Sequence, residues 1–469
     1  MNSTIQSIDA ESLAIIDLIK KYFETLSIEV GPVGNIFIVF MHDLAVHFSG
    51  ILMHRKAVEH YSDVAQFPWV NKMYALSPYP IVDSVNIESS PTRDLKLWLR
   101  QLSLSYVALG PALPFGYHKD WFSAKMINLL GCYKPYSGAY LPRRADQIEW
   151  LLACVRELCK IYEIPNAKVE LENWRKYAES HTAVKQILYR ERGVLLGSRN
   201  NLQNRKLAVN FLQQEKEVIA ITHGEVANSV MDEPPFGYSE RTLCTILIDY
   251  GSFDCDGEYN GPLILPKQRM YRNGPVAESI HRPSDTIRLP ASKPYRALYI
   301  PTTYTGNGLY GPFHIYEDAL YRKWQHALFQ TFPELTFKAH PKSVSRPPKS
   351  WKVERRQLEI CINDYELLVF DYFATGSMLA LVTDKPVIYF DIGLRRLHLE
   401  FIEDLKRRCE YAKIDLDSDM NQQVATALTK FWSSDVVRTN TTISRYSLCD
   451  DSRFKWLDVF RSVALGVAS

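Results

Sequence analysis

The chain has 469 residues, enough for two large α/β domains or about three smaller ones. With 46% hydrophobic and 23% charged residues, its composition is that of a globular protein, which excludes long-range disorder and fibrous folds. Because 55 Lys and Arg stand against 53 Asp and Glu, the net charge is only +2. The charge of the whole protein therefore does not favour nucleic acid as a partner.

Cysteine usage and hydropathy indicate the compartment. The eight cysteines are scattered and include no CxxC pair, which is typical of a reduced cytoplasmic protein without a zinc ribbon. The N-terminus lacks the apolar run of a signal peptide, and no stretch of 18 apolar residues occurs anywhere. We expect a cytoplasmic protein that at most lies on the inner face of the cytoplasmic membrane.

The first part of the chain mixes helical and strand patterns. Residues 8–26 have apolar side chains near helical spacing and predict an amphipathic helix. The run GNIFIVFM at 34–41, followed by His42-Asp43, predicts a buried strand. Residues 85–180 have a mostly helical pattern, and the sequence does not order them into a topology.

From residue 193 the pattern alternates between strand and helix. Apolar runs predict strands at 193–198, 217–225 and 244–252, with an amphipathic helix at 201–214 between the first two. Strand, helix and strand at this spacing form a βαβ unit, and hence a parallel sheet covered by helices. Residues 257–296 are rich in Pro, Gly and Arg and are predicted to be an interdomain linker.

A second α/β series follows the predicted linker. It consists of strands at 296–304, 335–341, 365–371 and 386–391 and helices at 315–330, 375–383 and 394–411. The sequence therefore predicts an α/β fold with two Rossmann-like halves. In such sheets ligands bind beyond the carboxyl ends of the strands.

Unusual polar residues stand at those predicted strand ends. They are His223-Gly224-Glu225, Asp249-Tyr250-Gly251, Thr302-Thr303, Lys338-Ala339-His340-Pro341, and Asp371 with Thr375-Gly376-Ser377. The last group leads into a helix, whose free N–H groups favour a phosphate, but Thr375 or Ser377 is equally suited to capping that helix. Lys338 has a simpler alternative as a solvated lysine at a strand edge, and Asp249 as a turn-forming residue.

Three motifs resemble a known family. FKAHP at 337–341, FATGSMLA at 373–380 and KPVIYFD at 385–391 resemble the donor half of bacterial GT-B glycosyltransferases that use CMP-activated sugars, such as sialyltransferases and Kdo transferases. In that family an HP dipeptide contacts CMP and a downstream Ser/Thr motif holds its phosphate. DYFATGS at 371–377 is also similar to an element of the CDP-glycerol glycerophosphotransferases. Both groups release CMP, and the resemblance covers roughly residues 190–410.

The resemblance implies two Rossmann-like domains facing each other across a cleft. Together with the pattern of strands and helices, it predicts an acceptor domain with helical insertions at 1–285, a donor domain at 286–450 and a C-terminal helix at 451–469, for which crossing back to the first domain is one arrangement. It implies donor contacts from the strand-end residues of the second half, namely Thr302, Thr303, Lys338, His340, Pro341, Thr375, Gly376 and Ser377.

Transfer from a CMP-sugar requires a reacting carboxylate beside the acceptor. The acidic triplet of the family is absent, and its nearest equivalents are Gly224-Glu225 and Asp249-Tyr250-Gly251. We expect Asp249 or Glu225 to react, with His223 as a partner. The sequence leaves open whether the product keeps or inverts the anomeric configuration.

The resulting prediction is a metal-independent transferase that moves Kdo or a sialic-type sugar onto a bacterial surface glycan, such as capsule or lipopolysaccharide. Its expected partners are the nucleotide-sugar and a free or lipid-linked glycan, with no cofactor and no nucleic acid. The alternatives are a CDP-glycerol or CDP-ribitol phosphotransferase and a catalytically silent GT-B scaffold. A metal-dependent GT-A enzyme would use Asp254-Cys255-Asp256, but Asp417-Ser418-Asp419 shows that such triplets are common.

The helix predicted at 394–411 also has two interpretations. Its basic residues are suited to an anionic membrane, where lipid-linked acceptors lie, whereas its apolar face is suited to packing against the domain. The basic residues are Arg395, Arg396, Lys406, Arg407 and Arg408.

Overall fold

The computed structural model describes most of the predicted elements. The described residues are 2–30, 36–60, 107–109, 141–142, 145–183, 192–196, 202–221, 243–250, 269–273, 286–287, 296–301, 321–340, 347–393, 397–434, 438–439, 443 and 446. The C-terminal helix predicted at 451–469 lies outside them.

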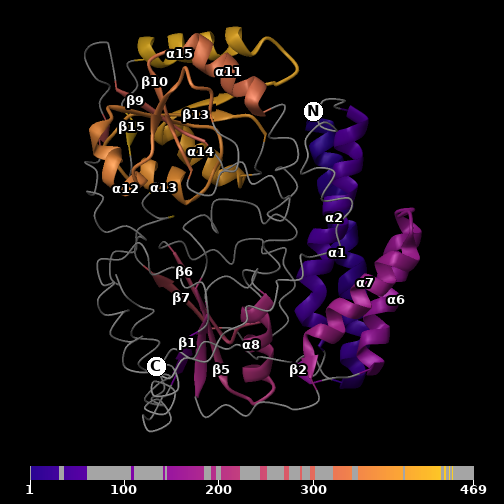
Figure 1. The fold of residues 1–469 in the computed structure, drawn as a ribbon. Helices are drawn as coiled ribbons and strands as arrows, with labels where there is room; N and C mark the ends of the chain where they lie inside the picture. The colour runs from indigo at the N-terminus through magenta and orange to yellow at the C-terminus, as the bar shows by residue number, and fades with distance from the viewer. Residues whose placement is uncertain are drawn as a thin grey trace.

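Four helices lie side by side next to the first sheet (Figure 1). They are α1 (Asn2–Val30), α2 (Phe37–His60), α6 (Ala145–Ile161) and α7 (Ala167–Ser180). Their apolar side chains form one continuous core with those of the first sheet and its covering helix. The helix predicted at 8–26 is confirmed as part of α1, and the helical pattern before residue 180 is confirmed by α6 and α7.

The strand predicted at 34–41 is wrong, because the apolar run lies in helix α2. Residues 36–41 are all buried, and a helix that is apolar all round gives the same sequence signal as a buried strand. His42 and Asp43, interpreted as the polar end of a strand, are instead buried inside the helix. Arg205 donates to the Asp43 carboxylate, and the Tyr177 hydroxyl donates to the same group over 2.8 Å.

The first sheet is parallel throughout and has the strand order β1-β4-β5-β6-β7. Its strands are β1 (Val107–Leu109), β4 (Gly193–Leu196), β5 (Glu217–Ile221), β6 (Ile246–Tyr250) and β7 (Arg269–Asn273). Helix α8 (Leu202–Leu212) connects β4 to β5, so the predicted βαβ unit is confirmed.

Two predictions around this sheet need correction. Residues 107–109 have a helical pattern but form β1, and residues 269–273 of the predicted linker form the edge strand β7. Both segments are held by backbone pairing with a neighbouring strand, β4 and β6 respectively. Sequence periodicity contains no information about such long-range pairing, which overrides local propensity.

The second sheet is also parallel and has the order β11-β10-β9-β12-β13-β14. The strands are β9 (Ala297–Ile300), β10 (Leu335–Lys338), β11 (Lys352–Glu354), β12 (Leu367–Phe370), β13 (Val387–Asp391) and β14 (Glu410–Lys413). Strands β9 and β12 are buried at every residue, as expected for central strands covered on both faces. The predicted α/β fold with two Rossmann-like parallel sheets is confirmed.

Helices cover both faces of this sheet (Figure 1). One core contains side chains of α11 (Arg322–Thr331) and α15 (Met420–Ser433). The core on the other face contains side chains of the short helix α12 (Leu358–Cys361), of α13 (Thr375–Leu381) and of α14 (Leu399–Arg408). The 3-10 turn η5 (Ile362–Asp364) follows α12 directly.

The helix predicted at 394–411 is too long at its C-terminus. Helix α14 ends at Arg408, and the following residues form strand β14 beside β13. Two short ladders complete the described structure: β2 (Leu141–Pro142) pairs with β3 (Thr182–Ala183), and β8 (Thr286–Ile287) pairs with β15 (Arg438–Thr439). The boundary predicted at residue 285 stays a prediction.

Candidate functional site

The strand order of the second sheet locates a candidate binding edge. Counted along the chain from β9, the order is third, second, first, fourth, fifth, sixth, so its direction reverses between β9 and β12. At such a reversal the connections leave the two central strands on opposite faces and leave a crevice at their carboxyl ends. The predicted donor residue Lys338 ends β10, next to β9, His340 follows it, and Thr375-Gly376-Ser377 follow β12.

Lys338 is not a solvated lysine at a strand edge, because its side chain is only 8% exposed. Its Nζ donates to the carbonyl of Ala339 over 2.8 Å, and it forms no ion pair with any described residue. Burial lowers the pKa of Lys338, although Cys361, Glu354 and Glu359 oppose the shift. The Ala339 amide donates to the carbonyl of Glu354 over 2.8 Å, which fixes the backbone that leads to the partly buried His340.

The segment at 374–377 begins helix α13, which has seven residues. The Ser377 side chain is buried; its hydroxyl donates to the carbonyl of Tyr372 over 2.5 Å and accepts from the Ala374 amide over 3.4 Å. These are the contacts of helix capping, one of the two roles predicted for this serine. Its role in phosphate binding stays a prediction.

Gly376 lies where another element approaches the backbone closely. A Cβ added at this position would stand 3.3 Å from Cδ2 of Leu358 on α12 and 3.6 Å from Cγ2 of Ile300 on β9. The start of α13 is therefore packed against the carboxyl end of β9. This places the predicted phosphate motif at the point where the sheet reverses its order.

Asp371, the first residue after β12, is the centre of a buried polar cluster. Its side chain is 1% exposed and accepts hydrogen bonds from the Tyr299 hydroxyl at 2.5 Å, the Tyr321 hydroxyl at 2.8 Å and Trp324 Nε1 at 2.7 Å. Gln325 Nε2 donates to the Tyr299 hydroxyl over 3.1 Å. The cluster joins β9, β12 and the start of α11, so it holds both strands of the reversal point in place.

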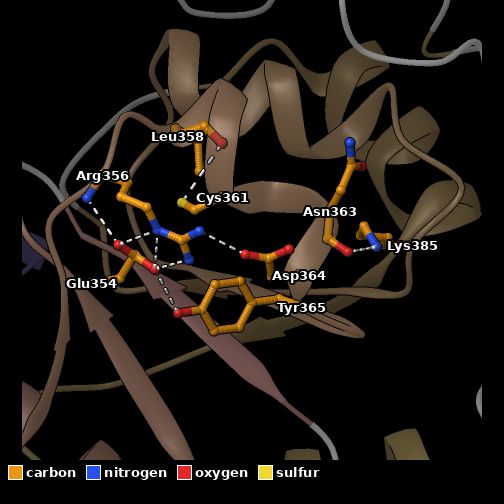
Figure 2. A network of polar contacts seen from close by, with 8 residues as sticks. All are labelled: Glu354, Arg356, Leu358, Cys361, Asn363, Asp364, Tyr365 and Lys385. Atoms are coloured by element: carbon orange, nitrogen blue, oxygen red, sulfur yellow. Dashed lines mark hydrogen bonds and ion pairs between the residues drawn. The ribbon is translucent and has the colours of Figure 1, made fainter.

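A second polar network lies at the edge strand β11 (Figure 2). Arg356 donates to the Glu354 carboxylate through Nε at 3.1 Å and Nη2 at 2.5 Å, and Nη1 lies 2.8 Å from Oδ2 of Asp364. The hydroxyl of Tyr365 donates to Glu354 over 3.2 Å. Hydrogen bonding from Arg356 is the main cause that lowers the pKa of Glu354 to about 2.

Several predicted site residues cannot be placed. His223, Glu225, Thr302, Thr303 and Pro341 lie outside the described residues, as do Asp254 and Asp256 of the alternative metal motif. For Asp249 and Thr375 only the backbone is described. Asp249 lies near the carboxyl end of β6 as predicted, in register with Arg272 of β7.

The remaining alternatives can be compared with described side chains. In the second acidic triplet, Asp419 caps helix α15 by accepting from the Gln422 amide over 3.0 Å, which is a structural role. The described residues contain no group of three or more His, Cys, Asp or Glu side chains suited to a metal ion. Among the described helices, none is both long and apolar enough to span a membrane.

The two interpretations of helix α14 are also distinguished by burial. The apolar residues Leu397, Phe401 and Leu405 are buried in the core, so this face packs against its own domain. Arg408 is fully buried and donates to the carbonyls of Leu381, Thr383 and Lys385. The apolar face and Arg408 are therefore not available to a lipid surface.

Sequence reasoning missed Arg356, Glu354 and the partners of Asp371. The partners are Tyr299, Tyr321 and Trp324, and aromatic residues at strand and helix positions usually indicate a core rather than a polar cluster. A single residue separates Glu354 from Arg356 in a polar stretch that carries no motif. The one sequence feature that could have indicated this network is the alternation of charged and apolar residues around Glu354, which is compatible with a short edge strand.

Comparisons with known proteins show distant similarity to some solved structures and to no protein family. No protein-family model and no curated protein matched the chain. Among solved structures, the spinosyn forosaminyltransferase SpnP is similar with a TM-score of 0.36 and 11% identity, covering 79% of this chain and 96% of that one. The glycotransferase of kitacinnamycin gives 0.36 and 11%, over 73% and 89%. The spinosyn rhamnosyltransferase SpnG complexed with spinosyn aglycone gives 0.33 and 12%, over 67% and 81%. At these TM-scores the fold assignment rests on the strand order itself.

Proposed function

We propose that the protein is a GT-B glycosyltransferase that takes a 3-deoxy-ulosonic acid, Kdo or a sialic-type sugar, from its CMP-activated donor. The observation that carries the proposal is the position of Lys338 and His340 beside the reversal point of a Rossmann-like sheet. This edge is where such sheets bind nucleotides. The residues there match the HP motif of CMP-sugar transferases.

Lys338 gives the donor site its charge. Lys338 is a largely buried residue without a carboxylate partner among the described residues, which is costly for its charged form, and a phosphate would offset that cost. His340, two residues further on, would contact the phosphate or ribose of CMP, with Thr302, Thr303, Pro341 and the 375–377 motif completing the site. The Asp371 cluster would hold the two strands that support it.

The first sheet would supply the acceptor side. In transfer, the bond between the anomeric carbon and the CMP phosphate breaks, CMP leaves with the electron pair, and the acceptor oxygen bonds to the anomeric carbon. Asp249, with Glu225 as the alternative and His223 as a partner, would accept the hydroxyl proton. No metal is needed in this scheme, because Lys338 and backbone N–H groups stabilise the leaving phosphate. The acceptor would be a bacterial surface glycan, free or lipid-linked, reached from the cytoplasmic side.

The second candidate function is a phosphotransferase that uses CDP-glycerol or CDP-ribitol. It is favoured by the same observation, because it also releases CMP and would use the same buried lysine and histidine. The two functions differ in the bond that breaks, and they are separated by assaying CMP-Kdo, CMP-sialic acid and CDP-glycerol as donors.

Calorimetric titration with CMP, UDP and GDP in EDTA tests the donor site. We expect CMP to bind selectively and without metal. Binding of UDP alone, or only after Mn²⁺ is added, would refute the proposal and favour the acidic triplet at 254–256.

Two variants then test the residue roles. His340→Ala is expected to weaken CMP binding about tenfold, whereas the matched control His326→Ala, an exposed histidine on α11, leaves it unchanged. Asp249→Asn is expected to abolish transfer while CMP still binds, with the exposed Asp17→Asn as its control. Full turnover by Asp249→Asn would move the reacting role to Glu225.

A further inference from the structure

Two opposite charges stand side by side in the second sheet without pairing. Lys338 of β10 and Glu354 of β11 are register partners in a parallel ladder, and their side chains are 8% and 9% exposed. Register partners on adjacent strands project to the same face about 4.8 Å apart, so a lysine and a glutamate there are within reach of an ion pair. The described structure contains no such pair.

The Glu354 carboxylate is occupied from the other side. Oε1 accepts from the Arg356 amide at 2.8 Å and from Arg356 Nε at 3.1 Å. Oε2 accepts from Arg356 Nε at 3.1 Å, from Nη2 at 2.5 Å and from the Tyr365 hydroxyl at 3.2 Å. Five hydrogen bonds use the acceptor capacity of this carboxylate, as Figure 2 shows.

Arg356 is itself held in this position. Its Nη1 lies 2.8 Å from Oδ2 of Asp364 in η5, so the guanidinium bridges two carboxylates on different elements. Lys338, by contrast, donates to the neighbouring carbonyl of Ala339 and to no other described residue. The charge of Glu354 acts on the nearby Lys338 ammonium and raises its pKa, but no described hydrogen bond or ion pair joins the two side chains.

We propose that Arg356 is a positioning residue of the donor site: by occupying the Glu354 carboxylate, it keeps the Lys338 ammonium available to the phosphate of the nucleotide donor. This inference rests on the proposed function, because it takes Lys338 as a phosphate contact. The motifs do not contain this arrangement of charges: Arg356 occupies the Glu354 carboxylate, so that the neighbouring Lys338 stays available to the ligand.

Removing the Arg356 guanidinium should allow the Glu354 carboxylate to form an ion pair with Lys338. In Arg356→Met the Glu354 carboxylate loses most of its donors and gains most by pairing with the buried ammonium of Lys338. Lys338 then has to give up the Glu354 carboxylate before it can bind the phosphate of the donor, which weakens donor binding. We expect CMP affinity to fall about tenfold, the factor that one charge-assisted hydrogen bond supplies.

The test uses the full chain and three variants. Arg356→Met is compared with Arg355→Met, a matched control that removes an exposed arginine next in sequence. The double variant Glu354→Gln/Arg356→Met removes the carboxylate that would capture Lys338. Each protein is titrated with CMP by calorimetry, and the pKa of Lys338 is followed by NMR on 15N-lysine-labelled protein, with Lys338→Arg assigning the signal.

We expect Arg356→Met to lose CMP affinity and to raise the pKa of Lys338, because a carboxylate partner favours the charged ammonium. The double variant should restore both values, and the control should change neither. Unchanged Lys338 pKa in Arg356→Met, or a loss of affinity that the double variant does not restore, would overturn the inference. If the pKa values respond as expected but the wild-type protein does not bind CMP, the charge division holds and the proposed function fails.

Discussion

Asp371 offers the sharpest test of how the candidate site is supported. The carboxylate is 1% exposed and accepts from two tyrosine hydroxyls and one indole N–H at 2.5–2.8 Å. In Asp371→Ala the hydroxyls of Tyr299 and Tyr321, 3.2 Å apart, can still pair with each other. Trp324 Nε1 can only donate, so it loses its acceptor inside the core.

The magnitude follows from these partners. Hydrogen bonds to a charged group contribute about 1.5–3 kcal/mol each, and a buried donor without an acceptor costs about 1–3 kcal/mol. With one tyrosine pair partly compensating, Asp371→Ala should lower the free energy of unfolding by about 3–5 kcal/mol. Asp371→Asn keeps one acceptor oxygen for Tyr299 and Trp324, and its amide can donate to a rotated Tyr321 hydroxyl, so about 1–3 kcal/mol is expected.

Urea unfolding followed by tryptophan fluorescence and circular dichroism measures both values, with the exposed Asp17→Asn as a control. The variants should rank in the order alanine, asparagine, wild type. Equal stability of alanine variant and wild type, within about 0.5 kcal/mol, would refute the structural role. Loss of CMP binding without loss of stability would instead assign Asp371 to the ligand.

Two other buried groups give further predictions. Arg205→Met leaves the Asp43 carboxylate buried without its cation, so the free energy of unfolding should fall by about 3–5 kcal/mol. The double variant Arg205→Met/Asp43→Asn should recover part of this loss. If the effects of the two single substitutions simply add in the double variant, the two side chains do not form a stabilising ion pair. Burial, reinforced by the charges of Lys206 and Arg205, lowers the pKa of His181 to about 4. Between pH 6.5 and 4 the histidine is therefore protonated in the unfolded chain and neutral in the folded protein. Wild-type stability should therefore fall as the pH decreases from 6.5 to 4, more steeply than that of His181→Phe, and parallel urea-unfolding curves across this range would contradict the assignment.

The strands that the sequence predicted well are those buried on both faces. GVLL at 193–196, ALYI at 297–300 and LLVF at 367–370 are short apolar runs that each follow a charged residue and end at Gly, Pro or Asp, and all three are central or near-central strands. A parallel sheet covered by helices requires this pattern, so the run itself carries the information. The run at 36–41 has the same composition but continues as a buried helix, which a short window cannot distinguish from a strand.

The order of the binding motifs was also readable from the sequence. Lys338-Ala339-His340 stands at the carboxyl end of the strand predicted at 335–341, and Thr375-Gly376-Ser377 begins a predicted helix; in the structure β10 ends at Lys338 and α13 begins at Thr375. What could not be read is which of these side chains are already engaged. Ser377 is used by its own backbone, Lys338 is buried, and Asp371 is surrounded by aromatic donors from two other elements.

The sequence alone determined the α/β class, the alternation of strands and helices and the residues at the strand ends, because these depend on local polarity and periodicity. Only the tertiary structure decided the strand order with its reversal between β9 and β12, the addition of β7 from a predicted linker, and the pairing of Glu354 with Arg356 rather than Lys338. Strand neighbours and charge partners are chosen by long-range packing and by competition among nearby groups. Both depend on which segments lie next to one another in the folded chain, and a local sequence pattern does not contain this information.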